Sequence, residues 1–65
     1  GFTNKLCEYR KKRRWTQAEL AEKSGVSRAT IAGIESGAIN NVKTDTLLKL
    51  SSALNVQVTR IFFTH

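Results

Sequence analysis

The 65 residues of this chain suffice for one small domain or for a fragment of a longer protein. A chain this short buries only about 60% of its unfolded surface, so we expect an economical all-helical core or a stabilising partner. Cys7 is the only cysteine and His65 the only histidine, which excludes an internal disulfide and leaves no convincing metal site. The composition indicates a reducing compartment, and we expect no metal or other cofactor.

The charge balance is strongly basic. Eleven lysines and arginines against five acidic residues give a net charge of +6 at pH 7 and a pI near 10.1. Such an excess suits a polyanion, whether DNA, RNA or an acidic membrane surface. No apolar run approaches the roughly 18 residues of a membrane span, and residues 2–6 are too few and too polar for the core of a secretory signal.

The first predicted helix covers about residues 4–13, capped by Thr3 or Asn4. Leu6, Tyr9 and the stem of Arg10 or Arg13 should face inward. Strand evidence is poor, because the only alternating stretch is residues 56–58. Tyr9 and Trp15 could be base-stacking platforms for single strands, but their helical placement favours core roles.

The second predicted helix has the strongest start signal in the chain. Thr16 and Glu19 have the spacing of a capping box, and Trp15 and Leu20 have that of the accompanying hydrophobic staple. The helix should end at residues 23–24, because Gly25 follows where a left-handed residue is needed.

The third predicted helix starts at Ser27 as its cap, with Val26 and Ile31 spaced for a second staple, and ends at residues 36–37. Two short helices joined by a turn of about three residues that contains glycine form a helix-turn-helix. A fourth helix should begin at residues 44–45 and stop at Asn55, with a last turn or short helix at about 59–63. The fourth helix carries Leu47, Leu50 and Leu54 on one face, with Leu48 at the edge of that face.

The third helix has two unlike sides. At 100° per residue, Ile31 and Ile34 define its buried side. The opposite side holds one long cation among small residues: Arg28, Ala29, Ala32, Gly33 and Ser36. Small residues allow a close approach to a groove, an arginine can bind guanine O6 and N7, and an alanine methyl can touch a thymine methyl. The alternative is a solvated face without a partner.

Polar residues flank this predicted reading element. Gln17 lies in the first turn of the second helix, where free backbone N–H groups favour a phosphate. Asn40, Asn41 and Lys43 follow the third helix in a loop and are candidates for phosphate contacts on its far side. The alternative for the loop residues is ordinary loop polarity, and for Gln17 it is a plain residue of the helix start.

The densest charge run covers residues 10–14, where cations also complement the end of a helix dipole. We expect a mixed role for this run: general attraction to DNA, and one phosphate contact from this end of the first helix. Glu35 lies at the edge of the buried side of the third helix and needs a neutralising partner, for which Arg10 is the best candidate. Cys7 has no positioned base, and no pattern of catalytic residues is present, so we do not expect an enzyme.

Residues 17–37, QAELAEKSGVSRATIAGIESG, closely resemble the helix-turn-helix of the phage repressor and Cro family. The resemblance extends from about Leu6 to Phe62 and includes the Arg10 and Glu35 pair, the LLKL stretch at 47–50, and Ala53 with Leu54. It implies a compact all-α, five-helix, lambda-repressor-like domain over residues 1–65, with the helix-turn-helix at about 17–36. Members are mostly bacterial or phage transcriptional regulators that bind near-palindromic operators as homodimers.

The resemblance also implies site residues by matching position. Gln17 matches a phosphate-anchoring glutamine, and positions that often touch phosphate are matched by Ser36, Asn40, Asn41 and Lys43. The positions from which such domains read bases are occupied by Ser27, Arg28, Ala29, Ala32 and Gly33. Gly33 departs from the family by lacking a side chain there, so Arg28 must carry more of the readout, or specificity is low.

We therefore expect a sequence-specific, repressor-like transcriptional regulator of double-stranded DNA. It should be cytoplasmic and nucleoid-associated, with residues 28–36 in the major groove. The apolar residues of the last segment either form a homodimer contact or simply pack in the core: Val56, Val58, Ile61, Phe62 and Phe63. The alternative function is an antitoxin or bridging module that holds a protein partner through the same fold, and a third is RNA binding through the basic run.

Overall fold

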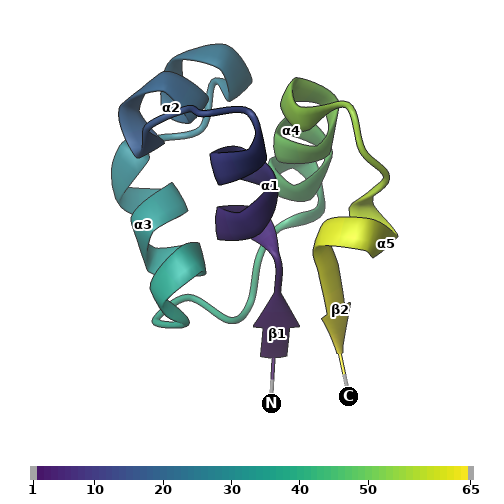
Figure 1. Cartoon of the computed structure of the whole chain (residues 1–65). Coiled ribbons are helices and arrows are strands. Elements are labelled where there is room, and N and C mark those ends of the chain that lie inside the picture. The colour runs from purple at the N-terminus through teal and green to yellow at the C-terminus, as the bar shows by residue number, and fades with distance from the viewer. Residues whose placement is uncertain (1, 65) are drawn as a thin grey trace.

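Short helices, each started or stopped by a specific residue, make up most of this computed structural model (Figure 1). It describes residues 2–64, and the side chains of residues 4–62. In chain order the elements are β1 (Phe2–Asn4), α1 (Leu6–Lys12), α2 (Gln17–Ser24), α3 (Arg28–Ser36), α4 (Thr44–Leu54), α5 (Val58–Ile61) and β2 (Phe62–Thr64). The predicted all-α class with five helices is confirmed.

The predicted caps start α2 and α3. The Thr16 hydroxyl accepts a hydrogen bond from the Glu19 backbone N–H (3.0 Å), and the Glu19 carboxylate accepts one from the Thr16 N–H (2.9 Å). Ser27 Oγ accepts from the Thr30 N–H at 3.2 Å. These bonds satisfy backbone donors that a helix start leaves without partners, so they fix where each helix begins.

Left-handed residues stop α2, α3 and α4 at the predicted positions: Gly25 (φ +77°), Gly37 (φ +86°) and Asn55 (φ +56°). The first helix begins later than predicted, at Leu6. Asn4 still acts at this start, because its Oδ1 accepts from the Leu6 N–H at 3.1 Å. Its Nδ2 donates to the Ile34 carbonyl at 3.1 Å, which ties the start of the chain to α3.

The core lies where all five helices meet. Its fully buried side chains are Leu6, Leu20, Ile31, Ile34, Leu50, Leu54 and Ile61. Tyr9 and Trp15 are half-buried against this cluster, which confirms core roles for both. Leu48 at the edge of α4 is 56% exposed. No helix within residues 2–64 is both long and apolar enough to cross a membrane.

The two ends of the described chain pair as antiparallel strands, with Thr3 opposite Phe63 and Asn4 opposite Phe62. The sequence did not predict this sheet, because the strands have three residues each and lie at opposite ends of the chain. The last helix was predicted at about 59–63, but it ends at Ile61 and Phe62 is extended (φ −116°, ψ 129°). Ile61 and Phe62 are buried, which favours core packing over a dimer contact for these two; the Phe63 side chain lies outside the described ones.

Candidate nucleic-acid interface

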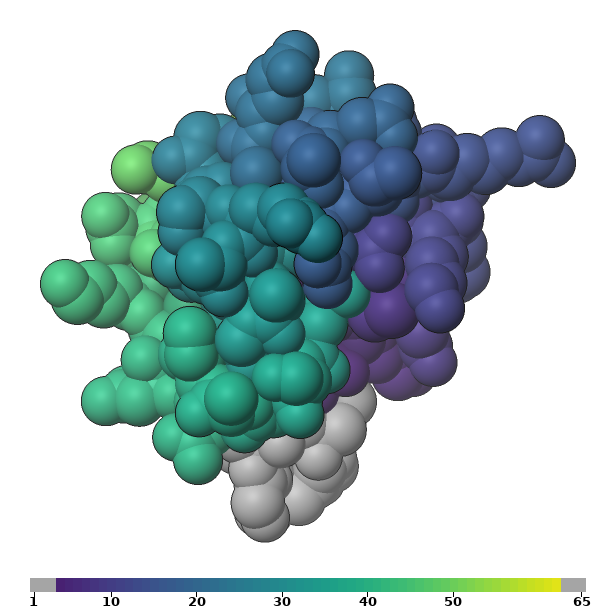
Figure 2. All heavy atoms as spheres, turned by 90° about the vertical axis from the view of Figure 1, so that its left-hand side faces the viewer, coloured from purple at the N-terminus to yellow at the C-terminus, as the bar shows by residue number. Residues whose placement is uncertain are grey.

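The third helix presents its small-residue side to solvent. Ile31 and Ile34 are fully buried, whereas Arg28, Ala29 and Ser36 are exposed. Ala32 and Gly33 are partly exposed between them. Figure 2 shows α3, in teal, in the middle of one face of the molecule, with the α1–α2 connection, in blue, along one edge and α4, in green, along the other. The helical arrangement predicted from the isoleucine spacing is therefore present.

Arg28 is the long cation of this face, and it is available for a ligand. It is exposed, and its guanidinium has no partner within the part of the chain that the structure describes. Ser27, just before it, is engaged: besides capping α3, its hydroxyl donates to Thr30 Oγ1 at 2.8 Å. The α3 start therefore offers a rigid backbone and one uncommitted charged group.

Arg10 and Glu35 form the predicted ion pair. Arg10 Nε donates to Glu35 Oε2 at 2.7 Å and Arg10 Nη2 to Glu35 Oε1 at 3.0 Å, with the side chains only 11% and 7% exposed. Arg10 Nη1 also donates to the Trp15 carbonyl at 2.7 Å. The pair joins α1 to α3 and neutralises the carboxylate beside the exposed face.

The pKa of Glu35 reflects this setting. Burial alone would raise it, but the hydrogen bonds from Arg10 and Gln17 and the charge of Arg10 together outweigh burial, so the pKa lies below its ordinary value of 4.5. The hydrogen bonds that Arg10 donates to Glu35 raise the pKa of Arg10. Both groups are therefore charged at neutral pH, and the guanidinium offsets the charge of the carboxylate beside the α3 face.

Gln17 belongs to the same network. It begins α2, and its Nε2 donates to Glu35 Oε1 at 3.1 Å. An amide nitrogen carries two hydrogens, so one remains for another acceptor. Glu35 thus holds the side chain of Gln17 at the edge of the α3 face, where the sequence places a phosphate contact. Sequence reasoning did not identify this second partner of Glu35.

Gly33 has a packing role that the sequence did not reveal. A Cβ built on it would lie 2.5 Å from Ile39 Cδ1 and 2.8 Å from Cγ1, and its carbonyl accepts from the Ile39 N–H at 2.9 Å. Both carbon distances are too short for real contacts, so only glycine fits beneath Ile39 as placed. The missing side chain thus lets Ile39 pack onto α3 without shifting. A base contact from Gly33 stays a prediction.

The loop after α3 holds the other predicted phosphate residues. Asn40, Asn41 and Lys43 are all exposed, and Lys43 precedes the first turn of α4. Ser36 is exposed too, but its hydroxyl donates to the Gly33 carbonyl at 3.2 Å and accepts from the Ala38 N–H at 3.3 Å. A hollow of about 270 Å³ lies here, lined by Thr30, Ile39, Asn41, Val42, Lys43 and Thr46. Thr30 and Thr46 were not among the predicted site residues.

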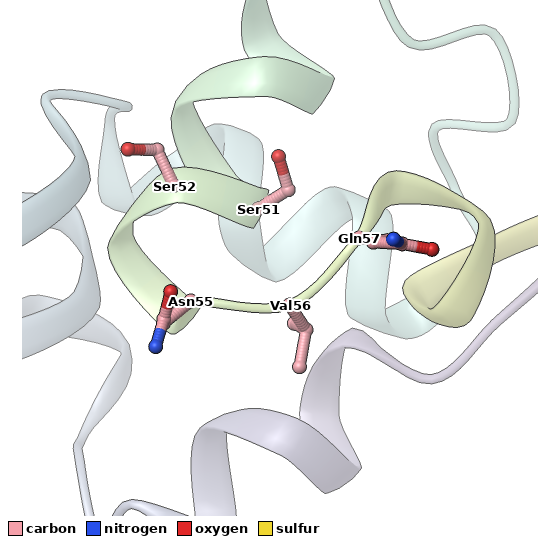
Figure 3. A pocket seen from close by; sticks show the side chains of 5 residues that line it. All are labelled: Ser51, Ser52, Asn55, Val56 and Gln57. Atoms are coloured by element: carbon pink, nitrogen blue, oxygen red, sulfur yellow. The ribbon is translucent and has the colours of Figure 1, made fainter.

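A second hollow, of about 300 Å³, lies at the end of α4 and the connection to α5 (Figure 3). It is lined by Ser51, Ser52, Asn55, Val56 and Gln57, with no charged group among these five. The Ser51 hydroxyl donates to the Leu48 carbonyl at 3.0 Å. Within the described residues, no group of three or more histidine, cysteine or acidic side chains is arranged to hold a metal ion. The α3 face is therefore the strongest candidate site.

This geometry is that of a helix-turn-helix with an exposed second helix, and comparison with known proteins identifies the class. The helix-turn-helix family pattern of the Cro/C1 type matches residues 8–61. The chain therefore belongs to this family, and its class is that of DNA-binding transcriptional regulators. Comparison with curated proteins gave no match.

Solved structures of SinR are similar to this chain. One is SinR, the master regulator for biofilm formation, in complex with DNA: 35% identity over 83% of this chain and 86% of that one, TM-score 0.81. Another is the N-terminal DNA-binding domain of SinR from Bacillus subtilis, 35% identical over 83% and 78%, TM-score 0.80. A third is a complex of the SinR and SinI proteins, 34% identical over 85% of this chain but 53% of the matched one, TM-score 0.81.

Proposed function

We propose that this chain regulates transcription by binding double-stranded DNA sequence-specifically, in a repressor-like manner, with the exposed side of α3 in the major groove. The observation that carries the proposal is Arg28, an exposed and unengaged cation on a helix whose other side is locked in the core. Its position at the helix start suits a bidentate contact to guanine O6 and N7. The chain would act by binding and not by catalysis, in the cytoplasm at the nucleoid.

The proposed contacts fall into two groups with different consequences. Base contacts specify sequence, whereas phosphate contacts position the domain without reading sequence. We assign base reading to Ser27, Arg28, Ala29, Ala32 and Gly33. We assign phosphate contacts to Gln17, Ser36, Asn40, Asn41 and Lys43. Because the hydroxyl of Ser27 already makes internal hydrogen bonds and Gly33 has no side chain, Arg28 carries most of the base reading in this proposal.

We further propose that two copies bind one near-palindromic site. The support is the similarity to SinR, solved with DNA, together with the short reading helix, which covers few base pairs by itself. Two α3 helices would then lie about 34 Å apart, one turn of DNA. Analytical ultracentrifugation with and without the DNA site tests this assembly. A single copy on a palindromic site would contradict it.

A protein partner is the second candidate, as in an antitoxin or bridging module. The supporting observation is a similar chain solved in a complex of the SinR and SinI proteins. Leu48, 56% exposed on α4, offers an apolar contact away from α3. A Leu48→Asp substitution should leave DNA affinity unchanged and abolish partner binding; loss of DNA binding would argue against separate surfaces.

Selection of binding sites from random DNA tests the main proposal, because it yields both the half-site and its spacing. On the selected site, Arg28→Ala should reduce the binding free energy by about 1–3 kcal/mol and relax specificity. Lys43→Ala should instead weaken binding to all DNA sequences evenly and reduce the slope of log K against log [salt] by about one. Equal weakening of all sequences by Arg28→Ala would refute base reading. An unchanged salt slope for Lys43→Ala would remove Lys43 from the interface.

A further inference from the structure

The connection between α1 and α2 contains an unusual backbone conformation. Among the described residues, Arg14 (φ +60°) and Asn55 (φ +56°) are the two non-glycine residues with positive φ. Asparagine visits the left-handed region routinely, but for arginine this conformation is costly because Cβ approaches the following carbonyl oxygen. Arg14 is therefore a strained residue, and backbone strain of this kind gathers at functional sites.

The strain arises from how α1 ends. The Arg14 N–H donates to the Lys11 carbonyl at 2.9 Å, and the Trp15 N–H donates to the Arg10 carbonyl at 3.3 Å. This pair of bonds is the Schellman ending, in which the left-handed position is usually glycine. Glycine would make the same two backbone bonds without strain, so the ending itself does not require an arginine.

Contacts within the protein do not explain the arginine either. Its neighbours use their charges internally: Arg13 donates to the Leu54 carbonyl at 2.6 Å, and the Lys12 ammonium lies 5.0 Å from the centre of the Tyr9 ring. Arg14 is exposed, and its guanidinium has no partner among the side chains that the structure describes, those of residues 4–62. A strained backbone therefore presents a cation that nothing in the described chain binds.

The location of Arg14 indicates what it binds. It lies three residues before Gln17, so their Cα atoms are at most about 11 Å apart. In Figure 2 the α1–α2 connection, in blue, borders the α3 face, and its side chains project outward at that edge. Gln17 is the proposed phosphate contact on this side of α3. If Gln17 contacts a phosphate as proposed, a cation within this distance lies within a few base-pair rises, of about 3.4 Å each, of the same contact.

We propose that Arg14 binds a phosphate of flanking DNA, outside the base pairs that α3 reads and on the Gln17 side. This inference rests on the proposed function and extends its footprint. A guanidinium can hold two phosphate oxygens at once, and the left-handed backbone fixes where its side chain leaves the protein. The contact reads no sequence, but it requires the DNA to continue past the half-site.

Three variants test the proposal on the intact chain with the selected DNA site. Arg14→Gly removes strain and charge, Arg14→Lys keeps the charge, and Asn55→Gly is the control at the other left-handed position. Arg14→Gly should raise the Tm by roughly 4–8 °C. It should also reduce the slope of log K against log [salt] by about 0.9. If the two proteins bind equally at 1 M salt, this change corresponds to an approximately eightfold loss of affinity at 0.1 M salt. Arg14→Lys should keep most of the slope, and Asn55→Gly all of it.

The length of the DNA provides the second readout. Trimming the base pairs beyond the half-site on the Gln17 side should weaken the natural chain but not Arg14→Gly. Natural affinity and salt slope in Arg14→Gly, or equal sensitivity of both proteins to trimming, would overturn the inference. If either result is found while Arg28→Ala still relaxes specificity, the Arg14 contact is refuted and the proposed function is retained. If Arg28→Ala weakens all sequences equally while the Arg14 effects persist, the base-reading proposal fails instead.

Discussion

Replacing Glu35 by glutamine should destabilise the protein severely. The substitution preserves shape but removes the charge that faces Arg10, and the new amide N–H₂ points a donor at groups that already donate. Arg10 and Glu35 are 11% and 7% exposed and share bonds of 2.7 and 3.0 Å, so water compensates little. Breaking a buried pair by removing one partner costs about 3–5 kcal/mol. A chain of this length has a total stability of about 3–10 kcal/mol.

The Glu35→Gln variant should therefore lose between about a third of its stability and all of it. Urea unfolding at pH 7 measures this, with Trp15 fluorescence and circular dichroism as two independent probes. The matched control is the double variant Arg10→Met with Glu35→Leu, which replaces the pair by apolar side chains and should be nearly neutral in comparison. A loss below about 1 kcal/mol for Glu35→Gln would show that the pair behaves as a surface salt bridge and would refute the reasoning.

The same pair predicts an acid limit. Because the pKa of Glu35 is lower in the folded protein than its ordinary value of 4.5, its contribution to stability is fully present above that value. It is lost as the pH falls through the folded pKa, when the carboxylate takes up a proton. Stability curves of the natural protein and Glu35→Gln should therefore converge below about pH 4.5. Parallel curves down to pH 3 would contradict a lowered pKa.

Other substitutions test the packing and the caps. Gly33→Ala gains about 1 kcal/mol of helix propensity but must displace Ile39, which costs about 1–3 kcal/mol, so it should destabilise the protein. In an Ile39→Ala background the same substitution should stabilise the protein by about 1 kcal/mol. Equal effects of Gly33→Ala in both backgrounds would refute the clash. Thr16→Ala should cost about 1 kcal/mol in urea unfolding and Thr16→Ser almost nothing. If Thr16→Ser cost as much as Thr16→Ala, the hydroxyl would not be the stabilising group.

Local signals allowed most of the helical framework to be predicted from the sequence. Thr16 and Ser27 start helices through bonds to residues three positions away, and Gly25 and Gly37 end them through their own backbone freedom. The Arg10–Glu35 pair also followed, because a carboxylate at the edge of a buried helix face requires a cation.

Features that depend on distant residues escaped sequence analysis. The β1–β2 pairing joins opposite ends of the chain, and neither three-residue strand carries a pattern of its own. The need for Gly33 became visible only with Ile39 packed above it. Arg14 contradicts the local preference for glycine at a left-handed helix ending, so sequence rules place no left-handed residue there.

Amide chemical-shift mapping tests the central claim, that the exposed side of α3 contacts DNA. Labelled protein is titrated with the selected DNA site, and with an unrelated duplex of equal length as the control. The largest changes should fall on α3 from Arg28 onward and on the first turn of α2 at Gln17, and those on α3 should be specific to the selected site. Largest changes at residues 51–57, around the α4–α5 connection, would contradict the account.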